Sequence, residues 1–210
     1  MLGTSVLVVP HRHPVLTAKM LATLDHAAPG RIILGAGVGW MKEEIELFGV
    51  PYERRGAWTD EALHIMRACW RDEHVSFAGE FFRFDDVACF PKPARGAIPI
   101  WIGGHSPRAL RRVAELGDGW HAAFADRAAL ESGIAGLRRA CGERKRDAST
   151  LAISVRLGLS ARQSAADLIT HLKSLREAGA EHVILESRMR DLGEMTSLYE
   201  RFADNVRGAL

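Results

Sequence analysis

The stretch "GRIILGAGVGWMKEE", residues Gly30–Glu44, decides the fold. It places glycines at alternate positions, 35, 37 and 39, directly after a short apolar run and before a charged, helix-like segment. Dinucleotide-binding folds carry GxGxxG after their first strand. Here the spacing is GxGxG, and the apolar run is the second expected strand of the chain and not the first. The pattern therefore favours a different α/β fold over a dinucleotide-binding fold.

Strand-like and helix-like segments alternate six times along the chain. The expected strands are residues 2–9, 31–34, 98–104, 119–124, 151–157 and 182–186. Among the helices, one shows an apolar stripe at Leu16, Met20, Leu24 and Ala27, and a second, capped by Thr59, shows one at Ala62, Ile65, Met66, Cys69 and Trp70. A later helix is expected to be capped by Ser164, with Leu168, Leu172 and Leu175 on one face. Such alternation predicts a parallel sheet with crossover helices. Glycines at the ends of several strands favour a (β/α)8 TIM barrel.

A complete barrel of this type has about 250 residues and eight strands. The chain has 210 residues and six expected strands, so the sequence predicts a barrel that lacks its first two strand-helix units. We expect a single domain over residues 1–210, with a β-hairpin excursion near residues 74–90. The connector "FPKPARGAIP" is too short and too apolar at its ends for a domain boundary.

Composition narrows the function classes. Lys plus Arg (28) nearly balances Asp plus Glu (26), so the net charge of +2 gives no reason to expect a nucleic-acid or membrane partner. No apolar run reaches the roughly 18 residues of a membrane span, and the N-terminus shows no leader pattern. Cys69, Cys89 and Cys141 form no CxxC pair, which is typical of a reducing compartment and predicts a cytoplasmic protein.

A phosphate site is predicted where the third strand ends. Gly103 and Gly104 let a ligand approach the backbone, His105 follows, and Ser106 with Pro107 is an N-cap and first-turn pair for a helix. Free N–H groups at a helix start bind anions. The alternative is a tight turn with nothing bound.

Histidines at strand ends raise the question of a metal. His11, His13, His105 and His121 resemble the layout of barrel metallohydrolases, but such sites also need a late carboxylate, and only Glu186 is available. We therefore expect no metal. The residues also identify no catalytic acid or base; His11, His121 and Glu43 are the candidates that face the barrel mouth.

Three segments together carry a family resemblance: "LGTSVLVVPHRHPVLTAKMLATLDHAAPGRIILGAGVGWMKEE", "RRGAWTDEALHIMRACW" and "PKPARGAIPIWIGGHSPRALRRVAELGDGWH". They resemble the luciferase-like monooxygenase superfamily, and most of all its actinobacterial branch of oxidoreductases that use the deazaflavin coenzyme F-420. The resemblance runs from Leu2 to about His121. It implies a (β/α)8 barrel that binds FMN or the deazaflavin at the C-terminal face and moves a hydride to or from the ring.

The resemblance also assigns roles to positions of this chain. Ser5 and Val6 match a strand position where a cis peptide forms a bulge behind the ring. The cofactor-binding turns that match are Gly35, Gly37 and Gly39 for the ring and its ribityl chain, and Gly103, Gly104, His105 and Ser106 for the phosphate.

Two departures refine these roles. Trp40 stands where sugar-phosphate dehydrogenases of the superfamily have an acidic proton donor, which argues against that substrate. Val38 replaces a phosphate-binding arginine of some FMN enzymes, which favours the deazaflavin. The units absent from this chain supply ring-contacting and catalytic groups in the family.

The resulting hypothesis is an oxidoreductase that transfers a hydride between coenzyme F-420 and a small organic substrate, with a homodimer as its candidate assembly. Two alternatives stay open: an FMN-dependent monooxygenase, and a non-catalytic, truncated barrel remnant with open sheet edges.

Overall fold

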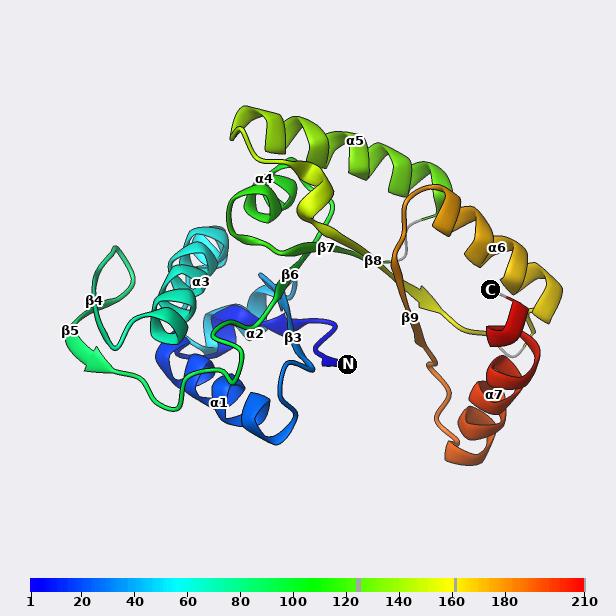
Figure 1. The fold of residues 1–210 in the computed structure, drawn as a ribbon, viewed down its shortest axis with the longest axis horizontal. Helices are drawn as coiled ribbons and strands as arrows, with labels where there is room; N and C mark the ends of the chain where they lie inside the picture. Colours follow the sequence, from blue (N-terminus) through cyan, green and yellow to red (C-terminus); the bar gives the residue numbers. More distant parts are fainter. Residues whose placement is uncertain (124–125, 161, 210) are drawn as a thin grey trace.

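A computed structural model describes residues 1–123, 126–160 and 162–209. Its main element is a curved parallel sheet in the order β1-β3-β6-β7-β8-β9, with β2 also paired to β3 (Figure 1). The strands are β1 (Leu2–Gly3), β2 (Leu7–Val8), β3 (Ile32–Gly37), β6 (Ile100–Gly103), β7 (Gly119–Ala123), β8 (Ala152–Gly158) and β9 (His182–Glu186). Since β1 and β2 are one interrupted strand, the sheet is the predicted six-stranded part of a barrel.

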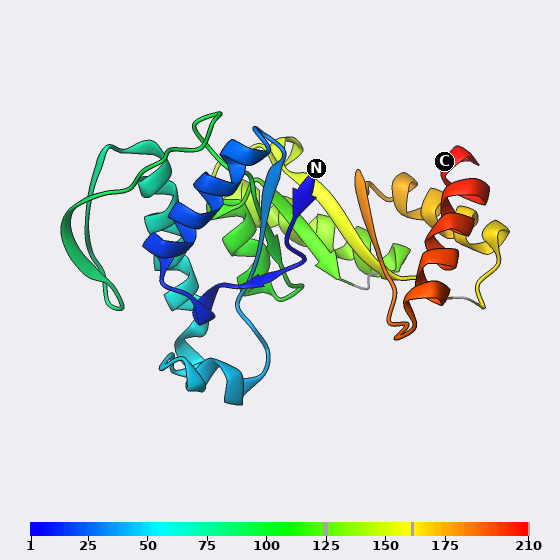
Figure 2. The ribbon, with the colours of Figure 1, turned by 90° about the horizontal axis from the view of Figure 1, so that it is seen from below.

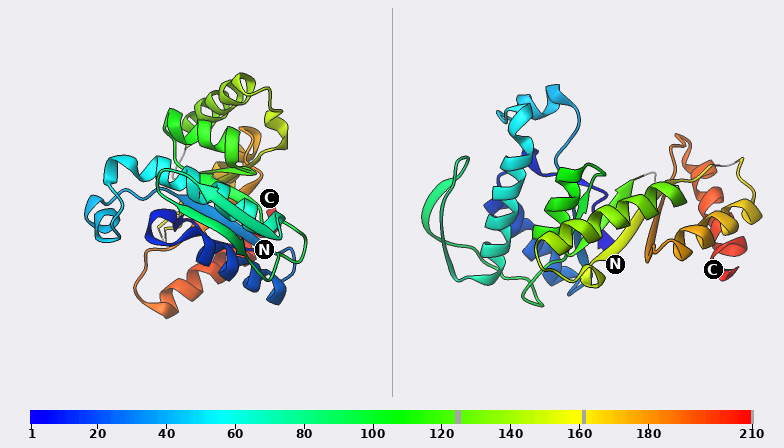
Figure 3. Two further views of the ribbon diagram at one scale, coloured as in Figure 1. Left: turned by 90° about the vertical axis from the view of Figure 1, so that its left-hand side faces the viewer. Right: turned by 90° about the horizontal axis from the view of Figure 1, so that it is seen from above.

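Helices cover the outer side of this sheet (Figures 1 and 3). They are α1 (Pro14–Ala27), α3 (Arg55–Arg71), α4 (Pro107–Leu116), α5 (Arg127–Glu143), α6 (Ala165–Glu177) and α7 (Leu192–Asn205). The short helix α2 (Lys42–Leu47) lies in the segment that follows β3, beyond the strand ends (Figure 2). The core lies between sheet and helices: Leu34, Ile102 and Trp120 are at most 1% exposed. Gly133 of α5 lies directly on the Trp120 ring. The short 3-10 turns are η1 (Val9–His11), η2 (Tyr52–Arg54), η3 (Ala148–Thr150) and η4 (Arg207–Ala209).

The first strand differs from its prediction. Residues 2–9 were expected to form one buried strand, but the ladder breaks between Gly3 and Leu7, and Leu2 is 53% exposed. The reason is a bulge at Thr4–Val6, where the Thr4 hydroxyl donates to the Gly35 carbonyl oxygen (2.8 Å). β1 also lies at the edge of the sheet, so one of its sides has no neighbouring strand among the described residues.

A hairpin of β4 (His74–Ala78) and β5 (Arg83–Ala88) lies where the sequence predicts one. It projects from the end of α3, at the opposite end of the molecule from α7 (Figures 1 and 2). The Glu61 carboxylate of α3 holds its turn, because it accepts hydrogen bonds from the backbone N–H groups of Glu80, Phe81 and Phe82. The hairpin is thus attached to the outer layer and lies away from the strand ends.

Helix starts confirm two predicted caps and correct a third. Ser106 caps α4, and Ser164 caps α6, each with its hydroxyl accepting from a first-turn N–H. Thr59 does not cap α3, which begins at Arg55 after the turn η2. The Thr59 hydroxyl instead donates to the Arg55 carbonyl oxygen inside the helix (2.8 Å), so its hydrogen bond is satisfied four residues after the start.

The apolar stripe predicted for α1 faces away from the core. Leu16, Met20 and Leu24 are 57%, 54% and 48% exposed. The buried side of α1 carries small or polar side chains, and Ala18 and Ala22 leave room for α3. Trp70 of α3 fills that room and donates its indole N–H to the Ala18 carbonyl oxygen (3.0 Å).

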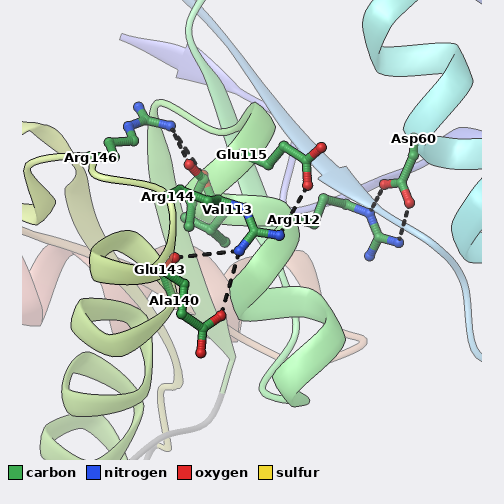
Figure 4. Close-up of polar contacts among 9 residues, drawn as sticks. Asp60, Arg112, Val113, Glu115, Ala140, Glu143, Arg144 and Arg146 are labelled. Atoms are coloured by element: carbon green, nitrogen blue, oxygen red, sulfur yellow. Dashed lines mark hydrogen bonds and ion pairs between the residues drawn. The ribbon is translucent and has the colours of Figure 1, made fainter.

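Ion pairs connect the outer helices (Figure 4). The guanidinium of Arg112 in α4 pairs with Asp60 of α3, and its side chain is only 9% exposed. Arg144, after α5, pairs with Glu115 of α4 (3.2 Å), while Arg146 donates to the Val113 carbonyl oxygen (3.4 Å). These contacts fix α3, α4 and α5 as one layer behind the central strands.

Candidate functional site

The site is built around the bulge that interrupts the first strand. The Ser5–Val6 peptide bond is cis, as the resemblance implies. Glycines of the neighbouring strands make room for it: a Cβ atom at Gly35 would lie 1.8 Å from the Thr4 carbonyl oxygen, and one at Gly37 would lie 2.5 Å from a Val6 methyl group. Gly35 and Gly37 of β3 therefore leave the space that Thr4 and Val6 of the bulge occupy.

A chain of polar side chains reaches the bulge from the inner side of the curved sheet. The Ser5 hydroxyl lies 2.8 Å from Nε2 of His121 in β7, and Nδ1 of His121 lies 3.0 Å from the Ser154 hydroxyl in β8. His121 is 3% exposed and Ser154 is fully buried. Burial, and then the nearby charge of Arg156, lower the pKa of His121 to about 4. The imidazole is therefore neutral at physiological pH and bridges two hydroxyls.

Arg156 of β8 makes a second contact with the bulge. Its guanidinium donates to the Ser5 carbonyl oxygen (2.5 Å), and its Nε lies 3.4 Å from a carboxylate oxygen of Glu186 in β9. Glu186 also pairs with the exposed Arg188 (3.4 Å). These contacts run between strands near opposite edges of the sheet, so its inner side is linked by charged and polar groups.

The predicted phosphate turn adjoins the bulge. A Cβ atom at Gly103 would lie 3.3 Å from a Val6 methyl group, and Gly104 has a φ of +111°, which favours glycine. The Ser106 hydroxyl accepts from the Ala109 N–H (3.2 Å). The Arg108 N–H has no hydrogen-bond partner among the described residues, so the start of α4 keeps a free donor.

The side chain of His105 in this turn contacts Ala123 and Trp120 of β7. Its Nε2 lies 2.9 Å from the Ala123 carbonyl oxygen, and its ring meets Trp120 edge to face at 5.9 Å. Trp120 donates its indole N–H to the Gly104 carbonyl oxygen (2.7 Å). The carbonyl of Gly104 thus points to the strand, and the backbone shape of the turn is fixed.

The loop after β3 is held by residues that the sequence did not single out. Arg55 donates to the carbonyl oxygens of Gly39 (3.2 Å) and Tyr52 (2.7 Å), and the Tyr52 hydroxyl donates to the Trp40 carbonyl oxygen (3.0 Å). A Cβ atom at Gly39, whose φ is +78°, would lie 2.6 Å from a methyl group of Ile45. This glycine therefore serves the packing of the loop, while the Trp40 side chain is 78% exposed.

The three candidate catalytic residues differ in environment. The imidazole of His121 is hydrogen-bonded to Ser5 of the bulge. The ring of His11 stacks on Phe48 (4.6 Å between centroids), and its buried Nε2 has no hydrogen-bond partner among the described residues. Glu43 is exposed in the first turn of α2.

Metal ligands do not converge. Over residues 1–123, 126–160 and 162–209, no group of three or more His, Cys, Asp or Glu side chains could hold a metal ion.

Two residues that contact the bulge or its partners were not predicted from the sequence. Ser154 and Arg156 stand at alternate positions of the strand "AISVRLG", where β-branched and apolar residues fill the other positions. Polar residues two apart in such a strand face one side of the sheet. That pattern was the available signal.

A curved parallel sheet with helices on its outer side, and with glycine turns at the carboxyl ends of its strands, defines a protein of the (β/α)8-barrel class. The family model for luciferase-like monooxygenases matches residues 1–205. The chain therefore belongs to the luciferase-like monooxygenase family, whose members are oxidoreductases or monooxygenases.

Relatives by sequence match only part of the chain. A protein of Mycobacterium tuberculosis is 37% identical over 120 residues, which are 57% of this chain and 43% of that protein. The F-420-dependent glucose-6-phosphate dehydrogenase of Nakamurella multipartita is 37% identical over 123 residues, 57% of this chain and 36% of that enzyme. The matched part thus spans less than half the length of either relative.

Solved structures share the fold over almost the whole chain. An F-420-dependent secondary alcohol dehydrogenase in complex with an F-420–acetone adduct superposes with a TM-score of 0.86 at 19% identity, covering 99% of this chain and 79% of that one. The oxygenating component of a 3,6-diketocamphane monooxygenase from Pseudomonas putida, in complex with FMN, gives a TM-score of 0.79 at 16% identity with the same two coverages. Within the described part of this chain, no helix is long and apolar enough to span a membrane.

Proposed function

We propose that this chain binds a flavin-type coenzyme, the deazaflavin F-420, and belongs to an oxidoreductase that transfers a hydride between that coenzyme and a small organic molecule. The observation that carries the proposal is the contact between the Ser5–Val6 bulge and the Gly103–Ser106 turn, through Val6 and Gly103. A surface for a flat ring and a turn for a phosphate are thereby neighbours at one end of the sheet.

The residues present fit such a coenzyme. Gly103 and Gly104 leave the backbone of the turn open, and the N–H of Arg108 at the start of α4 is free to meet an anion. Val6 offers an apolar surface beside the turn. The chemistry that the coenzyme supplies is hydride transfer at its ring, and the protein contributes orientation and exclusion of water.

Support for the deazaflavin over FMN comes from two sources. Val38 occupies the position of a phosphate-binding arginine of some FMN enzymes. Both an F-420-dependent relative and an F-420-dependent structural neighbour are similar to this chain. An FMN-dependent neighbour has the same fold, so FMN is the alternative that the experiment must separate.

The test is a titration of the purified chain with F-420 and with FMN, followed by coenzyme fluorescence. We expect F-420 to bind more tightly. Tighter binding of FMN would replace the coenzyme in the proposal with FMN, and the absence of binding by both would overturn the proposal.

A matched pair of glycine variants tests the phosphate turn. Gly104→Ala puts a Cβ atom 3.0 Å from the Ala109 methyl group at a φ of +111°, whereas Gly96→Ala meets nothing within 4 Å at a φ of +78°. Both variants carry the backbone cost of about 1 kcal/mol of a left-handed residue. We expect only Gly104→Ala to weaken coenzyme binding, and equal affinities of the two variants would contradict the placement of the phosphate.

A further inference from the structure

We infer that His121 and Arg156 are positioning residues that clamp the Ser5–Val6 bulge from the inner side of the sheet and thereby set the affinity for the coenzyme. This inference rests on the proposed function. It concerns residues that touch the bulge, and it assigns them no contact with substrate.

Both polar groups of Ser5 that face the inner side are engaged. Its hydroxyl lies 2.8 Å from His121 Nε2, and its carbonyl oxygen accepts from Arg156 (2.5 Å). These partners lie 116 and 151 residues further along the chain. The hydroxyl and the carbonyl of Ser5 thus each have a long-range partner, so these two contacts help to orient the Ser5–Val6 peptide plane.

On the opposite side the bulge is tied to β3 at Thr4, whose hydroxyl donates to the Gly35 carbonyl oxygen (2.8 Å) and whose N–H donates to the Ile33 carbonyl oxygen (3.4 Å), whereas Val6 meets glycines there. Gly35 and Gly37 of β3, together with Gly103 of β6, are the positions where added Cβ atoms would meet Thr4 or Val6. Glycine backbone can exclude movement towards itself but offers no side chain that holds the bulge in place. Movement of Ser5 away from β3 is therefore opposed by His121 and Arg156, while Thr4 is held by its own hydrogen bonds to β3.

Each clamp residue is itself held. The neutral imidazole of His121 has one N–H and one acceptor nitrogen, so it can bridge two hydroxyls, Ser5 at Nε2 and the fully buried Ser154 at Nδ1. The guanidinium of Arg156 is oriented by Glu186 in β9 (3.4 Å). His121 is thus hydrogen-bonded on both sides, and Arg156 is held between Ser5 and the Glu186 carboxylate; fixed supporting side chains of this kind are what a ring-binding surface requires.

The chain offers matched controls for both residues. His182, on the adjacent strand β9, pairs in register with Ser154, but its ring meets the Trp101 ring at a tilt of 46° (4.9 Å between centroids). Arg188 contacts the same Glu186 as Arg156 does, yet its side chain is 82% exposed. Each control therefore removes a side chain of the same type next to a residue that holds His121 or Arg156, namely Ser154 or Glu186.

The experiment compares His121→Leu with His182→Leu, and Arg156→Met with Arg188→Met, by two measurements. Hydrogen exchange of the N-terminal peptide that contains residues 2–9 reports the bulge without any coenzyme. Fluorescence titration with F-420 and FMN reports binding. Loss of one net hydrogen bond is expected to raise exchange and weaken binding by about three- to tenfold in the first member of each pair, and to change neither in the second.

A double-mutant cycle separates positioning from packing. If His121 acts through Ser5, the effect of His121→Leu on both measurements is much smaller in a Ser5→Ala background. Should the leucine variant fail to fold, His121→Gln, which keeps polar groups in the pocket, takes its place in the cycle. Fully additive effects would overturn the inference.

The outcomes distinguish this inference from the proposed function. Unchanged exchange of residues 2–9 in both His121→Leu and Arg156→Met would overturn the clamp. Faster exchange with unchanged coenzyme affinity would overturn its link to the coenzyme. If the unaltered chain binds neither coenzyme, the proposed function fails together with that link, while the exchange data still decide whether the clamp exists.

Discussion

The helices α1 and α3 pack against each other, yet they bury opposite kinds of side chain. α3 turns its large residues inward, including Leu63, Met66 and Trp70, all at most 3% exposed. α1 turns Ala18 and Ala22 inward and leaves Leu16 and its stripe in contact with solvent. The difference teaches that an interface needs one helix to fill space and the other to provide it.

The largest expected effect lies on the filling side of this interface. Trp70→Ala removes a fully packed ring and its hydrogen bond to the Ala18 carbonyl oxygen, so we expect the free energy of unfolding to fall by about 3–5 kcal/mol. Urea denaturation measures it. Leu24→Ala on the exposed stripe is the control, with an expected loss below about 1 kcal/mol. Equal losses would show that the stripe is buried in solution.

The next effect lies on the space-providing helix. Asp25 of α1 is 1% exposed, and its carboxylate accepts from the backbone N–H groups of Gly30 (3.0 Å) and Ala94 (2.9 Å). Asp25→Ala leaves both donors without their acceptor, so we expect a loss of about 2–3 kcal/mol in urea denaturation. Asp25→Asn keeps one acceptor oxygen and should lose less. An alanine variant as stable as the asparagine variant would contradict this role.

Two histidines of the sheet show a similar contrast, because His121 is buried and His182 is exposed. The pKa of the buried His121 is about 4, against 6.5 in an unfolded chain. As the pH falls from about 6.5 towards 4, the unfolded state takes up a proton that the folded state does not. Stability contributed by neutral His121 is therefore complete above pH 6.5 and decreases across this window by about 2–3 kcal/mol.

Thermal or urea unfolding between pH 4 and pH 7 measures this dependence. His121→Gln, which cannot titrate, should flatten the curve in this range relative to the unaltered chain. His182→Gln, at an exposed position of the sheet, is the matched control substitution. A curve that His121→Gln does not flatten would assign the acid sensitivity to other groups.

The order of elements was predictable because β-branched runs, helix caps and glycine turns are local signals. Ser106 and Ser164 cap helices as predicted, since a cap needs only its own first turn. The exposed face of α1 was not predictable, because which face a helix buries depends on the size of the partner side chain, here Trp70. Local pattern also could not separate residues 2–9 into two short strands.

The candidate site divides in the same way. The turn at Gly103–Ser106 and the cis bond at Ser5 followed from short motifs and the family resemblance. Arg156 of β8 contacts Ser5 of the bulge, 151 residues away in sequence, and Glu186 of β9. The curvature of the sheet brings the bulge and these two strands together, and no local sequence pattern reveals it. Glycines expected to line a ligand also turned out to make room for Thr4 and Val6.

The smallest expected effect concerns the exposed stripe of α1. The triple variant Leu16→Glu, Met20→Lys, Leu24→Gln replaces three half-exposed apolar side chains by polar ones, and positions 16 and 20 gain an i,i+4 ion pair. We expect the free energy of unfolding of the monomer to change by less than about 0.5 kcal/mol. Urea denaturation at low protein concentration measures this change.

The same variant tests where the expected homodimer forms. The exposed apolar side chains of α1 offer a second copy an apolar helix face, and β1 offers it a strand edge that is unpaired among the described residues. Sedimentation should then show a dimer for the unaltered chain and a monomer for the triple variant. A triple variant that stays dimeric places the dimer contact on another face, and one that loses several kcal/mol as a monomer would show that α1 buries its stripe and that the contrast with α3 is wrong.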